Sequence, residues 1–412
     1  MEKQKIFNAI TFILLAGFLL IPVVAECEDF EYRHIAGMRY RILSVVDQSV
    51  LVNNQLSHTS QILNRIAAEV TSVTGGNGMH RAVFQTSERV LYDSQGSEQP
   101  VSSLFQWERE YETVFERDKL GLLSIEDQYY MPIVRNVPVF PGRRLNIGER
   151  WTAPGYEVHD FRDAFGIQEP YRIHFVANYE YLGERPWEGQ NYQVFTINYN
   201  IATRPSPVQG RIYPVRISGT YNQTVYWDSE AGREKASEGS FRITYVMSDG
   251  RTFEFRSRVR AEVIEAEMMD RQQIINEIVD EINRLEIPDV NVRAVEEGIS
   301  ISLEDIRFHA DSDRMLAGEH IKLDRIAEIL MRYPDRDIMV SGHTALAGTA
   351  DGRMRLSQDR ARAVANYFLS QNVRSADRMV IRGFGAERPI ADNTTEEGMR
   401  RNRRVEITIL EN

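Results

Sequence analysis

The spacing of apolar residues changes near residue 264, and this change limits what the chain can fold into. Before it, runs rich in β-branched and aromatic residues alternate partly with period two, as in 40–46 and 241–246. Turn-forming groups separate these runs, and residues 248–250 form a hairpin signal. After the change, apolar residues recur every three or four positions, which is helical spacing. We therefore expect a β-rich domain with antiparallel sheets over 26–263, followed by helical and mixed structure.

The first 25 residues have the layout of a secretory signal peptide. Two lysines precede an apolar run over 6–24, which ends in Val23-Val24-Ala25. We expect cleavage after Ala25, which places the mature chain outside the cytoplasm. Two alternatives stay open. In the first alternative the run is an uncleaved membrane anchor, because its length approaches the ~20 residues that span a membrane. In the other, Cys27 is acylated and the chain is a lipoprotein, although Glu26 precedes the cysteine.

Composition excludes several classes of protein. The 412 residues indicate two or three domains. A net charge of −11 argues against a nucleic-acid binder, which needs a clustered basic surface. A single cysteine excludes an internal disulfide and a cysteine-based zinc site. No spacing typical of a metal site, cofactor loop or catalytic motif occurs, so we expect no metal, no cofactor and no enzyme activity.

The β-rich region allows two interpretations. Its strands look short and unevenly spaced, and charged stretches over 107–119 and 157–169 lie between them. This irregularity favours a soluble periplasmic domain. The alternative is an outer-membrane β-barrel, whose strands alternate apolar-out and polar-in over ~10 residues.

A helix over 264–288 is expected to link the two parts of the chain. Its apolar stripe follows heptad spacing, which is also typical of a coiled coil; the stripe consists of Ile264, Met268, Ile275, Ile278, Ile282 and Leu285. Packing on a neighbouring domain is the simpler interpretation. A homodimer formed through 264–285 is the alternative.

Residues 289–412 predict a compact α+β domain. A hairpin joins 290–295 to 299–303, a helix covers 321–330 and a second helix covers 356–370. Short strands are expected at 337–342, 380–383 and 405–410. Strands that alternate with helices over ~120 residues favour one sheet packed against helices.

Several ordered motifs in this domain resemble the OmpA-like peptidoglycan-binding family. They are Ile306-Arg307-Phe308, Ser341-Gly342-His343-Thr344, the segment 356–364 with Leu356-Ser357 and Arg360-Ala361, Gly383-Phe384-Gly385, the segment 389–393, and Asn402-Arg403-Arg404-Val405-Glu406. The resemblance covers about 120 residues. It implies a βαβαββ fold and non-covalent binding of the peptidoglycan stem peptide.

The resemblance also implies which residues bind the diamino acid of that peptide. Arg360 matches the family arginine that pairs with the ligand carboxylate, and a guanidinium offers two parallel donors for this contact. The family aspartate that binds the ligand ammonium is replaced by Ala345, and Arg353 replaces a usual asparagine. Asp311 could supply the missing carboxylate, and Asp351 is a weaker candidate. Otherwise the ligand preference has changed, for example to ornithine, or binding is weak or lost.

Four further residues complete the expected site: Phe308, Thr344, Leu356 and Arg403. Together these features predict a non-catalytic envelope protein of the periplasm, associated with the cell wall and the outer membrane. The C-terminal domain would bind peptidoglycan, and the β-domain would contact an outer-membrane or periplasmic partner. The rivals are the outer-membrane barrel with the same wall-binding domain and a wall-processing or envelope-assembly factor.

Overall fold

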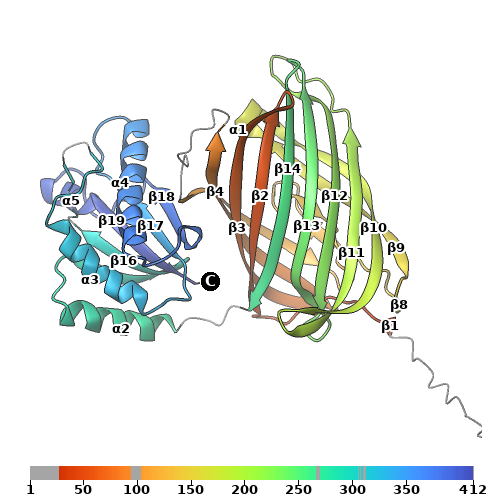
Figure 1. Cartoon of the computed structure of the whole chain (residues 1–412), viewed down its shortest axis with the longest axis horizontal. Helices are drawn as coiled ribbons and strands as arrows, with labels where there is room; N and C mark the ends of the chain where they lie inside the picture. The colour runs from red at the N-terminus through yellow and green to blue at the C-terminus, as the bar shows by residue number, and fades with distance from the viewer. Residues whose placement is uncertain are drawn as a thin grey trace, which may run out of the picture.

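The computed structural model describes residues 27–93, 104–265, 270–304, 306, 308–309 and 312–411. They form two units, an antiparallel sheet that curls around on itself, here called the rolled sheet, and a smaller α/β unit (Figure 1). The proposed signal peptide over 1–25 and position 311 lie outside the described residues. No helix among the described residues is long and apolar enough to cross a membrane.

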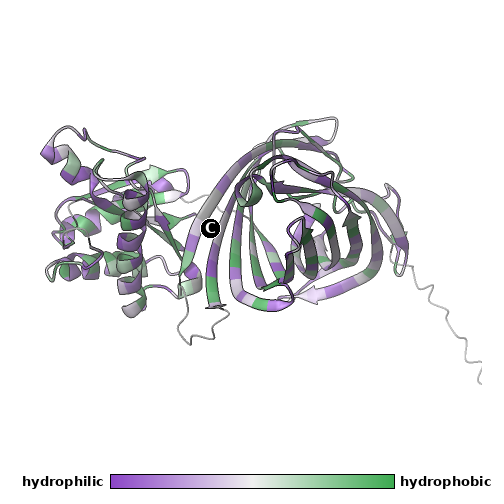
Figure 2. Cartoon of the chain, turned by 90° about the horizontal axis from the view of Figure 1, so that it is seen from above, coloured by the Kyte–Doolittle hydropathy of each residue, from purple (hydrophilic) through white to green (hydrophobic). Residues whose placement is uncertain are grey.

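The rolled sheet contains ten long strands, each paired with its neighbour. Their spatial order is β5-β4-β3-β2-β14-β13-β12-β11-β10-β9, so the first and last long strands of this unit, β2 and β14, pair with each other. Figure 2 shows the sheet from above, curled into a ring. The strands are β2 (Arg39–Val52), β3 (Gln55–Thr74), β4 (Asn77–Asp93), β5 (Phe105–Arg117), β9 (Arg150–Phe161), β10 (Ile167–Trp187), β11 (Gln190–Thr203), β12 (Pro214–Asp228), β13 (Arg233–Met247) and β14 (Thr252–Glu265).

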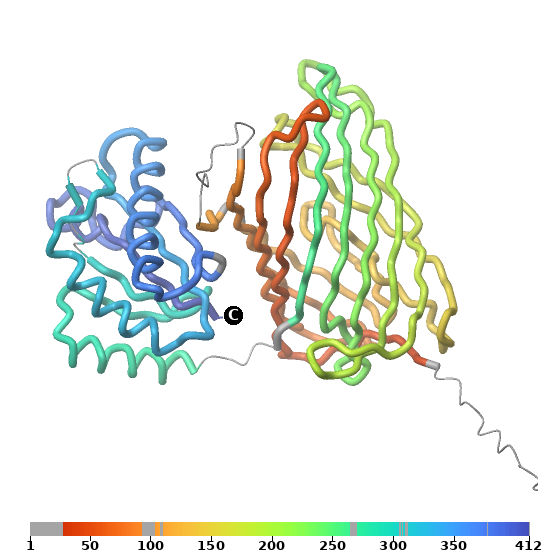
Figure 3. The backbone as a smooth tube through the Cα atoms, in the orientation of Figure 1, coloured from red at the N-terminus to blue at the C-terminus, as the bar shows by residue number. Residues whose placement is uncertain are grey.

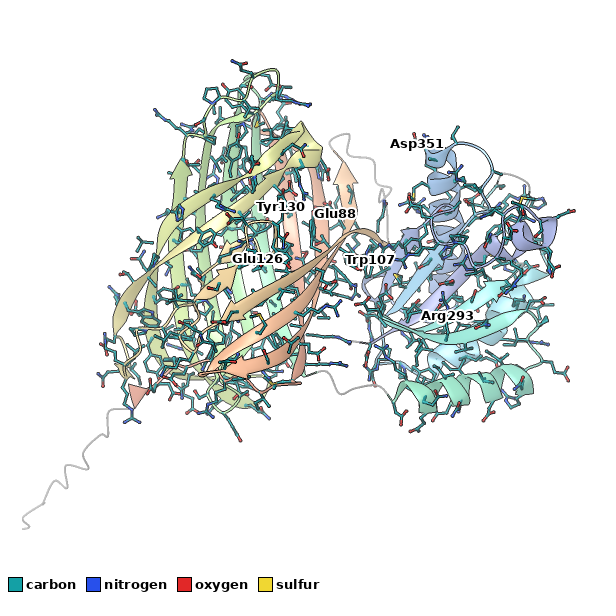
Figure 4. All side chains as sticks on the ribbon, turned by 180° about the vertical axis from the view of Figure 1, so that it is seen from behind. Glu88, Trp107, Glu126, Tyr130, Arg293 and Asp351 are labelled. Atoms are coloured by element: carbon teal, nitrogen blue, oxygen red, sulfur yellow. The ribbon has the colours of Figure 1, made fainter. Side chains whose placement is uncertain are left out.

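Short elements close the gap between the edge strands β5 and β9. They are β6 (Leu123–Ile125) and β7 (Val134–Arg135). The other short elements of this unit are β1 (Cys27–Glu28), which pairs with β8 (Leu145–Asn146), and helix α1 (Arg162–Phe165), which connects β9 to β10. β6 pairs with β5, and β7 pairs with β9. Residues 126–138, here called the strap, cross the gap, and Glu126 and Tyr130 are seen on it in Figure 4. On the strap, Asp127 forms an exposed ion pair with the Arg172 guanidinium of β10 at 2.6 Å.

Period-two alternation extends much further than the sequence suggested. β9 alternates buried and exposed residues from Arg150 onward, and the same holds along β10. The expectation of short strands is therefore wrong, because the ten strands are 12 to 21 residues long. The charged stretches 107–119 and 157–169 lie largely inside strands. Most of their charged side chains point outward between inward apolar ones, although Glu157 is buried. The outward charges conceal the strand pattern.

The two faces of the rolled sheet differ in polarity. Its inner face carries a core of aromatic and aliphatic residues, among them Phe195, Ile197 and Trp227 at 0–1% exposure. Outward positions on β14 are charged: Arg256, Arg258 and Arg260 are all exposed. Membrane-spanning strands place apolar residues outward. The observed distribution therefore favours the water-facing interpretation of this domain over the membrane-embedded alternative.

The α/β unit has one five-stranded sheet in the order β15-β16-β19-β17-β18. Helices pack on this sheet around a core that includes Ile301, Leu330, Val364 and Ile407. The chain order β16-α3-β17-α4-β18-β19 agrees with the expected βαβαββ arrangement, preceded by β15 and with a short α5 before β19. The elements are β15 (Val290–Val295), β16 (Gly298–Glu304), α3 (Glu319–Met331), β17 (Ile338–Gly342), α4 (Ala350–Ser370), the 3₁₀ helix Ala376–Arg378, β18 (Met379–Gly383), α5 (Glu396–Asn402) and β19 (Arg404–Leu410).

The linking helix is shorter than expected. Helix α2 (Arg271–Arg284) begins after Asp270, whose carboxylate accepts a hydrogen bond from the backbone N–H of Gln273 at 2.9 Å. The expected start at 264 is wrong, because Ile264 continues strand β14; Met268 lies outside the described residues. Ile278 and Ile282 are buried in the core of the α/β unit. The apolar stripe thus packs within the chain, and the homodimer stays an untested prediction.

The two units meet along strand β5. Its start pairs in parallel with β18, which adds β5 to the edge of the smaller sheet; the path is visible in Figure 3. Figure 4 shows Trp107 between the units. Trp107 is 5% exposed and shares an apolar cluster with Leu63, Phe105, Met339, Val380 and Leu410. The Arg65 guanidinium donates to the Asp337 carboxylate at 2.7 Å, and the carboxylate also accepts from Arg378.

This junction predicts that Trp107→Ala uncouples the two units. Removing a buried tryptophan side chain should cost about 3–5 kcal/mol, and the loss falls on the contact between units. Urea unfolding of the full chain, followed by circular dichroism, should change from one transition to two. Tyr92→Ala removes an exposed aromatic ring from β4 and serves as the control. An unchanged single transition in the Trp107 variant would show that the cluster does not hold the units together.

A close approach between α4 and β17 predicts a second effect on stability. A Cβ at Gly342 would lie 1.9 Å from the carbonyl oxygen of Ser357, which is backbone and cannot rotate away. Gly342→Ala should therefore displace α4 and lower the free energy of unfolding by about 2 kcal/mol or more. Gly318→Ala is the control, because nothing lies within 4 Å of its Cβ position. Equal midpoints for both variants in thermal unfolding would contradict this account.

Candidate functional site

Helix α4 packs against the carboxyl ends of β17 and β18, where Ser357 lies beside Gly342 and Gly383. The helix also contacts the loop that follows β18. The Ser357 hydroxyl donates to the Met354 carbonyl at 2.7 Å and accepts from the Gly385 N–H at 2.9 Å. The Thr344 N–H donates to the Gly385 carbonyl at 2.7 Å. Both loops are thus held against the helix, which fixes the backbone around Thr344 and Ala345.

Arg360 lies on α4, partly buried. Its Nε donates to the Ser312 carbonyl at 3.2 Å, and its guanidinium lies 4.9 Å from the centre of the Phe308 ring. Phe308 itself pairs with Met315 across a short bridge and packs on the core. The structure thus brings together two of the predicted site residues, Arg360 and Phe308. These contacts restrict the side chain, so less conformational entropy is lost when it pairs with a ligand.

Arg353 and Leu356 share the face of α4 that carries Arg360. Seven residues separate the two arginines, which is two helical turns. The Arg353 guanidinium donates to the Gly348 carbonyl, and its Nε is buried without a hydrogen-bond partner among the described residues. Arg353 therefore closes the start of the helix against the loop after β17.

Asp351 does not join this face. It precedes Arg360 by nine residues, which places it half a turn away around the helix. It is exposed in the first turn, at the tip of α4 in Figure 4. The weaker candidate for the missing carboxylate is therefore disfavoured, and the role of Asp311 stays a prediction.

Ala345 occupies a closed position, since it is only 4% exposed. The neighbouring Thr344 is 7% exposed, and its hydroxyl oxygen is buried without a hydrogen-bond partner among the described residues. A buried hydroxyl without a partner is costly unless something binds it. Thr344 therefore presents a free polar group beside the loop held by Gly385.

Arg403 ends helix α5 and is exposed. The residue before it, Asn402, is fully buried and holds the preceding loop: its side-chain oxygen accepts from the N–H groups of Ile390 and Ala391 at 2.8 and 3.0 Å. Asn402 also donates to Asn393, whose side chain accepts from the Leu346 N–H. Sequence reasoning missed this support, although both asparagines lie in the motifs that carried the resemblance.

A buried charge network supports the sheet beneath the site. Glu406 accepts from Arg404 at 2.7 Å and pairs with Arg293 at 3.1 Å; Arg293 is labelled in Figure 4. Burial lowers the pKa of His343 to about 3, with Arg404 acting in the same direction. His343 is therefore neutral near pH 7, and its ring stacks on Phe384. Within the described residues, no group of three or more His, Cys, Asp or Glu side chains could hold a metal ion.

Comparison with known proteins bears on this site. The model of the OmpA family matches residues 307–403. Outer membrane porin F of Pseudomonas aeruginosa is 33% identical over 116 residues, which cover 28% of this chain and 33% of that protein. The probable lipoprotein YiaD of Escherichia coli is 39% identical over 104 residues, 25% of this chain and 47% of YiaD.

The peptidoglycan-binding protein ArfA of Mycobacterium tuberculosis is 35% identical over 104 residues, 25% of this chain and 32% of ArfA. The matched segment spans less than half the length of each of these relatives. The family match over 307–403 contains Phe308, Arg360 and the loops on either side of α4. The chain therefore carries an OmpA family domain at its C-terminus.

Proposed function

We propose that the C-terminal domain binds peptidoglycan non-covalently and that Arg360 holds a carboxylate of the stem peptide. The observation that carries this proposal is the position of Arg360, oriented by Phe308 and by the Ser312 carbonyl. A guanidinium held in this way can pair with a carboxylate through two parallel hydrogen bonds. The Thr344 hydroxyl, which is buried without a hydrogen-bond partner among the described residues, would give a further contact to the peptide.

The role proposed for the whole protein is to tether the wall. The relatives include a protein named for peptidoglycan binding and others named for the outer membrane. The chain would lie in the periplasm, where the apolar N-terminal run would direct it. Because β5 docks on the edge of the α/β sheet, a wall-bound domain would hold the rolled sheet at a fixed distance from the wall.

Ala345 bears on which diamino acid is preferred. A methyl group there cannot pair with the ligand ammonium, and burial of an unpaired ammonium is costly. We propose that Asp311 supplies the compensating carboxylate. The alternative is a preference for a different diamino acid, such as ornithine.

Arg360→Ala should abolish retention of the full chain on purified peptidoglycan sacculi. Loss of a charge-assisted pair of about 2–3 kcal/mol corresponds to a thirty-fold or larger loss of affinity. Arg355→Ala removes an exposed arginine from another face of the same helix and should bind as well as the parent. Equal sedimentation of the parent and the Arg360 variant with sacculi would disprove this assignment.

Ala345→Asp should strengthen binding of stem peptides that carry a free side-chain ammonium. A new charged pair of about 1–3 kcal/mol predicts at least a fivefold lower Kd in calorimetry. Acetylation of the same ammonium should remove the gain. An identical gain for the acetylated peptide would mean that position 345 does not face the ammonium.

A further inference from the structure

A cavity of about 750 Å³ lies inside the rolled sheet. Residues of nine of its ten long strands and of the strap form its wall. On β13 the wall extends from Glu234 to Tyr245, positions roughly 35 Å apart along an extended strand. The volume falls within the range of small-molecule sites. Its extent along the strand suits a long, narrow molecule.

Part of this wall is apolar and uncovered. Ile42 on β2, Ile62 and Ile66 on β3, and Val259 and Ala261 on β14 point inward, yet each stays partly exposed. Phe195 on β11 and Trp227 on β12 instead pack against the rings of Phe30 and Phe140. The interior is therefore filled where these rings pack and hollow beside the apolar residues of β2, β3 and β14. An apolar chain inside the hollow would remove this surface from water.

A polar cluster lies in the same wall, centred on Glu157, which is 1% exposed. Its carboxylate accepts hydrogen bonds from the hydroxyls of Tyr199 at 2.9 Å and Tyr221 at 3.2 Å. His159 Nε2 lies 2.6 Å from the same carboxylate, and its Nδ1 lies 2.9 Å from the Tyr245 hydroxyl. Burial raises the pKa of all three tyrosines, so their hydroxyls stay protonated. The hydroxyls of Tyr199 and Tyr221 thus both donate to the buried carboxylate of Glu157.

A second carboxyl group, that of Glu234, faces the cavity at its other end. Burial raises its pKa, and the cation that opposes this among the described residues is Arg117. The Arg117 guanidinium lies 4.6 Å from the ring centre of Tyr32, and Arg117 is not part of the cavity wall. The Glu157 carboxylate would repel an anionic head group, and both carboxyl groups can accept a hydrogen bond from a donor.

We propose that this cavity binds one amphiphile with an extended hydrocarbon chain and a head group that donates hydrogen bonds, an amine or a hydroxyl. The chain would cover the inward isoleucines and valine, and the head group would lie against a wall carboxyl. This site is distinct from the peptidoglycan site and does not depend on it.

The test uses the full chain and the fluorescent probe N-phenyl-1-naphthylamine, displaced by dodecylamine, dodecanol or dodecanoate. Dodecylamine and dodecanol should displace the probe at concentrations about tenfold or more below that of dodecanoate. Ala261→Trp fills the cavity and should weaken probe binding by about tenfold or more. Val176→Trp adds the same ring on the outside of β10, at a position that is 57% exposed, and should bind the probe as the parent does.

Two results would overturn the proposal. One is displacement by dodecanoate as effective as that by the amine and the alcohol. The other is unchanged probe binding in a folded Ala261→Trp variant. If circular dichroism shows that this variant does not fold, Ile62→Phe provides the same test with a smaller change in volume. Retention on sacculi should be the same for all these variants, which separates this site from the wall-binding one.

Discussion

The guanidinium of Arg382 lies between two rings, 4.9 Å from the centre of Trp107 and 4.4 Å from that of Phe384. Trp107 belongs to the rolled sheet, and Phe384 precedes Gly385 in the loop that α4 holds. One cation thus contacts both the junction of the two units and the loop beside Arg360. Cation–π contacts of this kind strengthen when water is excluded, as it is around the buried Trp107. Arg382 therefore contributes both to the contact between the two units and to the position of the loop beside Arg360.

The rolled sheet follows from alternation sustained over long strands. Apolar residues mostly face inward and charged residues mostly face outward along the long strands, with Glu157 and Glu234 among the exceptions. Closure of the sheet therefore buries one face and leaves the other to water. Beside β2, β3 and β14 the inward side chains do not fill the space that the sheet encloses. The hollow that results is lined by apolar surface and by a buried carboxylate, which is the composition of a binding cavity more than of a core.

Much of the C-terminal domain could be predicted from the sequence, because its strands and helices carry strong local periodicity and ordered motifs. Strand lengths in the rolled sheet were underestimated, because outward charges on β5 and β9 resemble loops. The helix boundary was placed too early, because Ile264 fits a helical stripe and a strand equally well. The pairing of β5 with β18 joins residues 275 positions apart, such as Phe105 and Val380, and no local pattern signals it. The spacing of Glu157 and His159 did indicate that the two side chains lie together, since residues two apart share one face of a strand.

Hydrogen–deuterium exchange of the full chain with a soluble muropeptide tests the central claim most directly. If the C-terminal domain binds the stem peptide between α4 and its neighbouring loops, exchange should slow at 343–348 and 384–386. The amides of the rolled sheet should exchange at the same rate with and without the ligand. Slower exchange confined to the rolled sheet, or no change at a saturating concentration of muropeptide, would contradict the account.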